Sequence, residues 1–255
     1  MSTAANVAVD PRQYQPPPDA LRDRVILVTG AGDGMGRAVA LALAAHSATV
    51  VLSGRTVRKL EKTSDDIVAQ GSPQPGIAPL DLETALAGEY DTLADALARN
   101  YGRLDGLLHN AGLLGHLSPI EHYDVPTWVR VMHVNVNAAF ALTQVCIPLL
   151  KKSSDAAVVF TSSTLGRRGR ALWGAYAVSK FAIEGFSQVL ADELQPAGVR
   201  VNAINPGRAR TTMRLQAYPA EDRSSIPEPA TLVGPYLYLL GPASRGVTGQ
   251  TFDCQ

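Results

Sequence analysis

The feature that restricts the fold of this chain most strongly is a short apolar run that leads directly into a cluster of glycines. The run is Val25–Thr29, and the sequence then reads Gly30-Ala-Gly-Asp-Gly-Met-Gly36 before a small-residue helical stretch, Arg37–His46. Such a run is typical of a buried parallel strand. Glycines let the backbone approach a pyrophosphate, and the N-terminus of the next helix supplies N–H donors. The pattern therefore predicts a βα unit that binds a dinucleotide, against the alternative of a tight turn without a ligand.

From Arg24 onward, apolar strand patterns alternate with helical patterns, which indicates a parallel sheet covered by helices on both faces. The expected strands are Val25–Thr29, Thr49–Ser53, Gly76–Leu80, Gly106–His109, Ala157–Thr161, Arg200–Asn205 and Gln250–Phe252. The expected helices are Met35–His46, Thr56–Gln70, Glu89–Tyr101, Pro126–Lys152, Ala175–Gln195 and Pro229–Leu240. We therefore predict an α/β fold, with residues 24–255 forming a single doubly wound domain of the Rossmann type.

Residues 1–23 differ in composition from the rest of the chain. They are rich in Ala, Pro and Gln, show no periodicity, and lack the hydrophobic middle section of a signal peptide. We expect an extended or disordered N-terminal arm. The sequence leaves open whether this arm packs across its own domain or across a neighbouring subunit.

Charge and composition argue against several kinds of partner. The 23 basic and 23 acidic side chains give a formal net charge of zero, whereas a protein that binds nucleic acid or an anionic membrane needs a basic excess. We expect no nucleic-acid partner, no membrane partner and a cytoplasmic protein. Cys146 and Cys254 lie far apart and are expected to be reduced thiols rather than a disulfide. The five histidines show no metal-ligand spacing, so we expect no metal.

Tyr176, Lys180 and Ser163 form a second pattern with chemical meaning. A Tyr-x-x-x-Lys spacing puts both side chains on one face of a helix, one turn apart. A free tyrosine has a pKa near ~10, and the lysine cation is expected to lower that pKa toward the working range. Ser163, rather than its neighbour Ser162, is expected to hold the substrate oxygen. Alone, the spacing is weak evidence, because helices also use Tyr and Lys for packing and solubility.

The end of the second expected strand bears on the choice of cofactor. An NAD-binding fold normally places an acid near this strand end, where it binds the ribose 2′-hydroxyl. Here the position is Gly54, followed by Arg55, with Arg58 and Lys59 on the next turn. A guanidinium suits a 2′-phosphate, so we predict NADP(H) over NAD(H). Asp33 in the glycine loop is the counter-evidence, although it also suits a helix N-cap.

Several segments of the chain resemble the short-chain dehydrogenase/reductase family, and the resemblance runs from about Arg24 to the C-terminus. The segments are Thr29–Gly36, His109–Gly112, Val134–Val136, Thr161–Ser163 with Tyr176 and Lys180, and Asn205–Gly207 with Thr211. His109 stands where the family motif has its first Asn, which puts the bonding near the central strand in doubt. Within the family, the chain is most similar to the YciK group of bacterial oxidoreductases, through Leu104–Gly115 and Gly166–Tyr176.

The resemblance implies a seven-stranded parallel sheet in the order 3-2-1-4-5-6-7, with residues 212–228 covering a substrate pocket. It implies four catalytic residues, Asn135, Ser163, Tyr176 and Lys180, of which Asn135 is expected to hold a water that links Lys180 to solvent. Ser163 and Tyr176 should also contact the substrate. The residues expected to bind the cofactor are Gly30, Asp33, Gly34, Met35, Gly36, Arg55, Asp81, Leu82, Asn110, Ala111, Gly112, Tyr176, Lys180, Pro206, Gly207 and Thr211.

These patterns together predict an NADP(H)-dependent oxidoreductase that interconverts a carbonyl and an alcohol by hydride transfer, with Tyr176 as general acid and base. A 3-oxoacyl-thioester reductase would share every motif, and a non-catalytic NADP(H)-binding sensor is the alternative from another class. The long helices 126–152 and 175–195 resemble those that pair subunits in this family. We therefore expect a homodimer or a homotetramer.

Two groups of arginines are expected near the mouth of the pocket. They are Arg167, Arg168 and Arg170 after the serine, and Arg208, Arg210 and Arg214 after the Pro-Gly turn. One hypothesis is that one or more of them attracts an anionic substrate, such as a carboxylate or a phosphate ester. The favoured alternative is that they form salt bridges, within their own chain or across a subunit interface. Trp173 is expected either to line the pocket or an interface, or to pack in the core.

Overall fold

The protein is described by a computed structural model that covers residues 10–255. Within these residues, seven parallel strands form one sheet in the order β3-β2-β1-β4-β5-β6-β7, as predicted. The strands are β1 Val25–Thr29, β2 Thr49–Gly54, β3 Gly76–Pro79, β4 Gly106–His109, β5 Ala157–Thr161, β6 Arg200–Asn205 and β7 Thr251–Asp253. The helices are α1 Gly34–Ala45, α2 Val57–Ala69, α3 Ala87–Tyr101, α4 Val125–Met132, α5 Ala138–Leu150, α6 Gly174–Leu194, α7 Thr212–Ala217 and α8 Gly234–Leu240.

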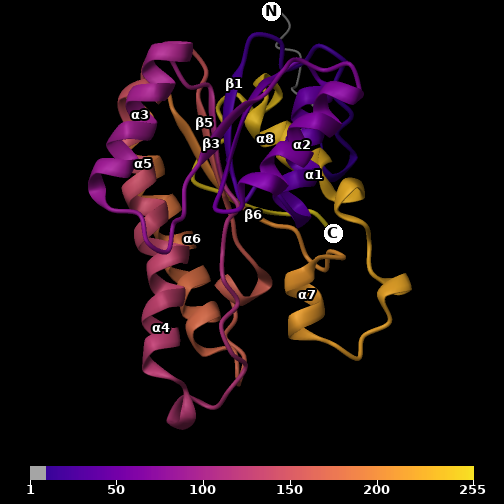
Figure 1. Cartoon of the computed structure of the whole chain (residues 1–255), viewed down its shortest axis with the longest axis vertical. Helices are drawn as coiled ribbons and strands as arrows, with labels where there is room; N and C mark the ends of the chain where they lie inside the picture. The colour runs from indigo at the N-terminus through magenta and orange to yellow at the C-terminus, as the bar shows by residue number, and fades with distance from the viewer. Residues whose placement is uncertain (1–9) are drawn as a thin grey trace, which may run out of the picture.

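Helices cover both faces of the sheet, and each face has its own apolar core (Figure 1). On one face, α1, α2 and α8 pack over the sheet through side chains such as Leu43, Ile67 and Tyr236. On the other face, α3, α5 and α6 bury side chains such as Leu142 and Ile183. Strands enclosed in this way are buried on both sides, which explains why β1 and β5 read as continuous apolar runs.

The helix predicted over Pro126–Lys152 differs from the expectation in one respect. It starts at Val125, ends at Leu150 and is interrupted by a π-helical turn, His133–Asn137. By length and composition this 26-residue helix could cross a membrane, but half of its most apolar stretch is buried in the protein. It packs against α3 and α6, as a core helix does.

The last predicted helix is shorter than expected. Residues Pro229–Leu232 form a 3₁₀ turn, and α8 begins only at Gly234, with Pro235 in its first turn. Proline lacks an N–H donor and is favoured at a helix start, so it marks the beginning of α8. Residues 212–228, expected to cover a substrate pocket, contain the short helix α7.

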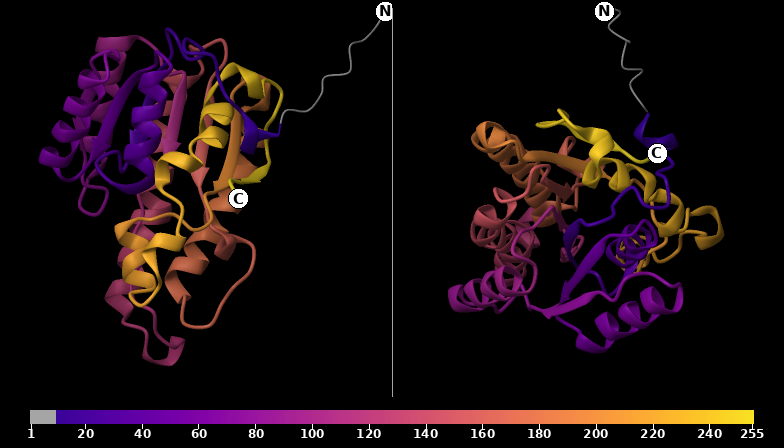
Figure 2. Two further views of the ribbon diagram at one scale, coloured as in Figure 1. Left: turned by 90° about the vertical axis from the view of Figure 1, so that its right-hand side faces the viewer. Right: turned by 90° about the horizontal axis from the view of Figure 1, so that it is seen from above.

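The described part of the N-terminal segment lies against the domain. Its 3₁₀ turn, Pro11–Gln13, lies beside α8 (Figure 2). Tyr14 contacts Tyr238 edge to face, with 5.5 Å between the ring centroids, and Leu21 is 1% exposed. The expectation of an extended or disordered arm concerns residues 1–9 as well, and those lie outside the described residues. The domain boundary at residue 24 stays a proposal.

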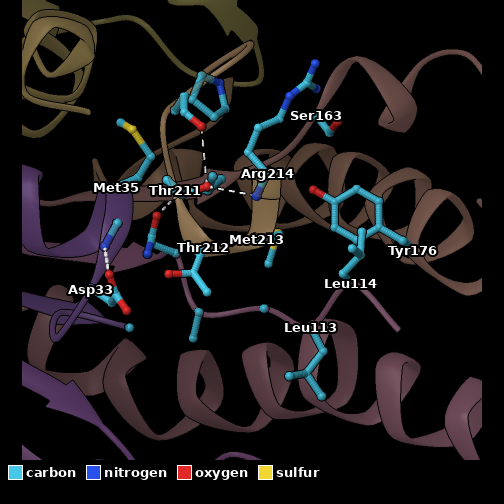
Figure 3. A pocket seen from close by; sticks show the side chains of 18 of the residues that line it. Asp33, Met35, Leu113, Leu114, Ser163, Tyr176, Thr211, Thr212, Met213 and Arg214 are labelled. Atoms are coloured by element: carbon cyan, nitrogen blue, oxygen red, sulfur yellow. Dashed lines mark hydrogen bonds between the residues drawn. The ribbon is translucent and has the colours of Figure 1, made fainter. Parts of the chain in front are cut away.

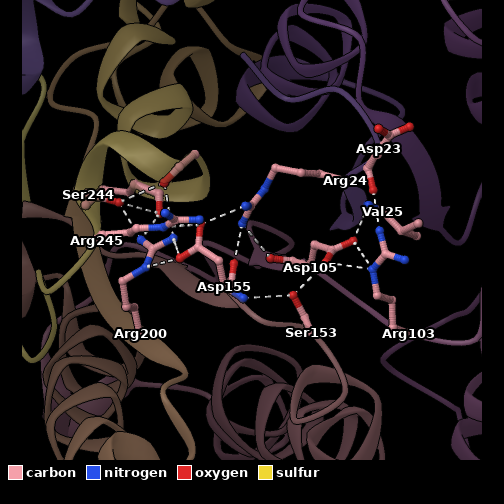
Figure 4. A network of polar contacts seen from close by, with 12 residues as sticks. Asp23, Arg24, Val25, Arg103, Asp105, Ser153, Asp155, Arg200, Ser244 and Arg245 are labelled. Atoms are coloured by element: carbon pink, nitrogen blue, oxygen red, sulfur yellow. Dashed lines mark hydrogen bonds and ion pairs between the residues drawn. The ribbon is translucent and has the colours of Figure 1, made fainter. Parts of the chain in front are cut away.

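A network of buried charges lies at the amino ends of the central strands (Figure 4). Asp155 accepts hydrogen bonds from Arg24 Nη1 at 2.9 Å and from Arg200 Nε at 3.3 Å. Asp105 binds Arg103 and the backbone N–H of Val25. These contacts join the starts of β1, β4, β5 and β6, at the opposite edge of the sheet from the carboxyl ends of the strands, so the network stabilises the fold.

Candidate active site

A cavity of about 1060 Å³ lies at the carboxyl ends of the strands. It opens where the strand order reverses, between β1 and β4, which is the usual ligand site of a doubly wound sheet. Figure 3 shows Asp33 on one side of this cavity and Tyr176 on the other, with Thr211 and Met213 between them. The cavity therefore has two chemically different ends, one beside Asp33 and the other beside Tyr176.

Ser163, Tyr176 and Lys180 line the same end of this cavity. Ser163 lies two residues after β5, while the other two lie in the first turns of α6. Lys180 Nζ lies 5.5 Å from the centroid of the Tyr176 ring. The same nitrogen donates a hydrogen bond of 2.7 Å to the carbonyl of Thr161, at the end of β5. The ammonium is thus fixed beside the phenol, as the helical spacing predicts.

The pKa of Tyr176 shifts in the opposite direction from the sequence-based expectation. Burial raises the pKa of Tyr176 to about 12, and the Ser163 hydroxyl acts in the lowering direction. Burial also lowers the pKa of Lys180, to about 8. The desolvation of the phenolate outweighs the Ser163 hydrogen bond, and a helical spacing carries no information about desolvation. The phenol is therefore protonated at neutral pH and can donate a proton.

Asn135 lies in the π-helical turn and is 3% exposed. Its Oδ1 accepts from the N–H of Leu113 at 2.7 Å, and its Nδ2 donates to the carbonyl of Leu113 and to Ser179 Oγ, both at 2.9 Å. It does not itself line the cavity. It holds the segment after β4 against α6. A Cβ added at Gly112 would lie 3.3 Å from Asn135 Oδ1 and 3.9 Å from Lys180 Nζ. The amide of Asn135 and the ammonium of Lys180 therefore both lie close to Gly112.

The glycine loop joins β1 to α1 in a backbone conformation that needs glycine. Gly30 has φ +67° and Gly34 has φ +52°, both in the left-handed region. A Cβ on Gly36 would lie 2.3 Å from the carbonyl oxygen of Gly30. Gly36 therefore allows α1 to pack closely on the loop and does not line the cavity, unlike Gly30, Gly34 and Met35.

The end of the cavity near β2 is lined by residues of both charges. Arg55 lies 3.5 Å from Glu83, and Lys59 Nζ lies 2.6 Å from Asp33 Oδ2. The Lys59 ammonium holds the pKa of Asp33 below its usual range. Asp33 also accepts from the N–H of Gly34 at the start of α1. Glu83, which sequence reasoning missed, connects this end to Arg130 of α4 at 2.6 Å.

The remaining residues expected at the cofactor line the cavity as well. They are Asp81, Leu82, Asn110, Ala111, Gly112, Pro206, Gly207 and Thr211. Sequence reasoning missed the role of Thr29, whose Oγ1 accepts from the N–H groups of Asn110 and Ala111 at 3.0 and 3.1 Å. It also missed Ser162, which donates to buried Glu184 at 2.6 Å beneath the serine loop.

Most of the arginines expected near the pocket form ion pairs. Arg167 pairs with Asp253 at 2.5 Å, and Arg210 pairs with Glu228 at 2.5 Å. Arg214 and Arg208 both pair with Glu221, at 2.6 and 3.6 Å. The salt-bridge interpretation is therefore right for these four, within one chain. Arg168 and Arg170 make no ion pair with any residue in 10–255.

His109 occupies the position at which the resemblance was imperfect. Its Nε2 lies 2.8 Å from Thr143 Oγ1, and its ring stacks on Phe160 with 4.7 Å between the centroids. Burial lowers its pKa to about 3, so the ring is neutral at neutral pH. It joins β4 to α5. Within residues 10–255, no group of three or more His, Cys, Asp or Glu side chains is arranged to hold a metal ion.

The chain is similar to several known proteins over most of its length. The family model described as short chain dehydrogenase matches residues 24–222. The uncharacterized oxidoreductase YciK of Escherichia coli K12 is 52% identical over 242 residues, which is 95% of this chain and 96% of that protein. A short chain dehydrogenase from Shigella flexneri 2a complexed with NADP has a TM-score of 0.92 and 51% identity, and covers 94% of this chain and 100% of its own. Another, from Escherichia coli CFT073 complexed with NADPH, has a TM-score of 0.92 and 52% identity, with the same coverage.

Proposed function

The chain belongs to the short-chain dehydrogenase family, and on that premise we propose that it is an NADP(H)-dependent oxidoreductase that interconverts a carbonyl and an alcohol. The observation that carries the proposal is the common cavity. Ser163, Tyr176 and Lys180 line one end of it, and the glycine loop with Arg55 lines the other. A binding protein without catalysis has no need for a half-buried phenol beside a buried ammonium at a dinucleotide site.

Each of the four polar residues has a role in moving a proton. Bound NADP(H) supplies or accepts the hydride. In the reductive direction, Tyr176 donates its proton to the carbonyl oxygen, while Ser163 holds that oxygen by a hydrogen bond. Lys180, fixed by the carbonyl of Thr161, stabilises the phenolate that results. Asn135 positions the Leu113 segment beside Lys180 and is proposed to hold a water that returns the proton from solvent.

The residues at the β2 end fit NADP(H) better than NAD(H). Gly54 stands where an NAD-binding fold carries an acid, and Arg55 lines the cavity there with Lys59. The Arg55 side chain is 56% exposed, so it is free to turn toward a phosphate. The relatives complexed with NADP and NADPH support the same cofactor for this chain. The charge of Asp33 is neutralised by its ion pair with Lys59, so Asp33 does not oppose the binding of NADP(H).

Arg55→Ala is expected to weaken NADPH binding by about 10- to 100-fold, the value of one charge-assisted hydrogen bond or ion pair. The Kd of NADH should change little, because NADH lacks the 2′-phosphate. Both Kd values can be measured by the fluorescence of the reduced nicotinamide. Arg58→Ala is the matched control, because Arg58 lies on the same turn and does not line the cavity. Equal losses of NADPH and NADH affinity in Arg55→Ala would contradict this assignment.

Turnover separates the proposed activity from its alternatives. The purified protein should oxidise NADPH when given a panel of small carbonyls, which can be followed by absorbance. Turnover confined to a 3-oxoacyl thioester would identify the thioester reductase. Tight NADPH binding without turnover on any carbonyl or thioester would favour the sensor.

We propose that two copies or four copies of the chain associate through α4, α5 and α6. Exposed apolar side chains gather on these helices: Val125, Val129, Phe140, Val178, Phe181 and Val189. Exposed groups of this kind are typical of protein interfaces. The same association would bury the exposed apolar face of the long helix formed by α4 and α5.

We also propose that the protein is cytoplasmic and has no membrane or nucleic-acid partner.

Phe181→Glu is expected to convert the assembly to smaller species, because it places a carboxylate on this apolar face. The mass in solution can be measured by light scattering after size-exclusion chromatography. Val68→Glu is the control, because Val68 is exposed on α2, which covers the opposite face of the sheet. A wild-type protein that has the mass of one chain would contradict the proposed assembly.

A further inference from the structure

The end of the cavity beyond Tyr176 has apolar walls. Trp173 is 8% exposed and lies between two tyrosine rings, with centroid distances of 5.9 Å to Tyr176 and 5.7 Å to Tyr218. Leu114, Leu165, Met213 and Ala217 pack with these rings and also line the cavity. A wall of this composition binds the apolar body of a substrate.

The charged groups that line this end are all basic. The acids that line the cavity are Asp33, Asp81 and Glu83, and they belong to the end near β2, where Asp33 pairs with Lys59 and Glu83 with Arg55. At the end beyond Tyr176 the charged lining residues are Arg168, Arg170, Arg208 and Arg214. Two of these four, Arg208 and Arg214, share one carboxylate, Glu221, as their ion-pair partner. An excess of positive charge is left at this end.

Two of the arginines carry that excess. The Arg168 side chain makes no hydrogen bond or ion pair with any residue in 10–255, and Arg170 makes only one hydrogen bond, from Nη1 to the Tyr218 hydroxyl at 2.9 Å. Both lie on the loop between Ser163 and Tyr176. The bond from Arg170 to Tyr218 joins this loop to the end of α7. The loop therefore presents guanidinium groups with unused donors at the cavity.

We propose that the substrate is a carbonyl compound with an apolar body and a terminal oxyanion, and that Arg168 and Arg170 bind that oxyanion. The carbonyl lies at Tyr176 and Ser163, the apolar body lies against Trp173 and Met213, and the oxyanion lies at the loop. Guanidinium groups bind carboxylates and phosphates with two parallel hydrogen bonds, which adds geometric selectivity to charge. This inference rests on the proposed carbonyl reduction, and it assigns the class of substrate.

The test compares acids with their uncharged esters. Aldehydes that carry a carboxylate at increasing distance (4-carboxybenzaldehyde, 6-oxohexanoate and 8-oxooctanoate) are each paired with the methyl ester, and 4-formylphenyl phosphate tests the other oxyanion. The wild type is expected to show a kcat/KM at least about tenfold higher for an acid than for its ester, the value of one charge-assisted contact. That ratio should decrease as salt increases, because the guanidinium groups are exposed.

The double variant Arg168→Gln with Arg170→Gln is expected to bring the acid-to-ester ratio close to one. Arg99→Gln is the matched control, because it removes one charge from an exposed position on α3 and should keep the wild-type ratio. Ratios near one in the wild type for every pair, including the phosphate, would overturn the proposal and leave carbonyl reduction intact.

A binding measurement keeps the two proposals separable. If no aldehyde is reduced, the proposed activity fails, and the oxyanion site is then tested directly. Benzoate and methyl benzoate are titrated against the protein saturated with NADP⁺, and the fluorescence of Trp173, measured in a Trp128→Phe background, reports occupancy of the cavity. Tighter binding of benzoate, lost in the double variant, supports the oxyanion site. Equal binding of both compounds overturns it.

Discussion

Replacing Tyr176 with phenylalanine is expected to lower kcat by about 10²- to 10⁴-fold, the usual effect of removing a general acid. The phenol is half-buried at the cavity wall, and desolvation raises the pKa of Tyr176 to about 12, so that the proton it gives to a carbonyl oxygen is in place at neutral pH. Phenylalanine keeps the ring that packs on Trp173 and loses only the hydroxyl. The Kd of NADPH should therefore change by less than about threefold, while turnover collapses.

Tyr90→Phe is the matched control for this variant. Tyr90 lies in α3, away from the cavity, and its buried hydroxyl has no hydrogen-bond partner within the described chain. Removing that oxygen should leave kcat unchanged. A Tyr176→Phe variant that keeps more than about a tenth of the wild-type kcat would show that another group supplies the proton.

Asp155→Ala is expected to reduce the free energy of unfolding by about 3–5 kcal/mol, the usual cost of removing one member of a buried charge network. Asp155 is 7% exposed and binds Arg24 and Arg200, which are 9% and 5% exposed. Burial lowers the pKa of Arg200, and Asp155 acts against that shift. Without the carboxylate, two guanidinium groups stay buried between the starts of four strands (Figure 4).

Urea unfolding at a fixed protein concentration measures this loss, because association would otherwise shift the apparent stability. Arg245→Ala is the control from the same network. Its side chain is 70% exposed and lies 3.6 Å from Asp155, so its removal should cost no more than about 1 kcal/mol. If both variants lost the same small amount of stability, the network would contribute no more than surface ion pairs do.

The alternation of strand and helix patterns was sufficient to predict a parallel sheet, with β1 and β5 as its clearest apolar runs, whereas the strand order came from the family resemblance. The sequence was not sufficient to predict the π-helical turn at Asn135. Residues 126–152 keep a helical apolar pattern throughout, and one extra residue in a turn leaves no mark in such a pattern. The turn depends on contacts with Leu113 and Ser179, which are distant in sequence.

The site was predicted well where a residue acts through a local spacing, and less well where it acts through a distant partner. Tyr176 and Lys180 lie one helical turn apart, so their proximity follows from the helix alone. The direction of the pKa shift of Tyr176 depends on burial by segments from α7 and the serine loop, and spacing carries no information about burial. The ion-pair partners of Arg167, Arg208, Arg210 and Arg214 were likewise unpredictable, since the acids come from the stretch after α7 (Glu221 and Glu228) and from β7 (Asp253).

The measurement that tests the proposed activity most directly is the transfer of label from NADPH to a product alcohol. NADPH that carries deuterium at the reactive carbon of the nicotinamide is incubated with the protein and a panel of carbonyls, and the products are analysed by mass spectrometry. The proposal predicts an alcohol with one deuterium on its carbinol carbon, formed by the wild type and lost in Tyr176→Phe. Tight binding of NADPH without labelled alcohol from any carbonyl, or equal labelling by both proteins, would contradict it.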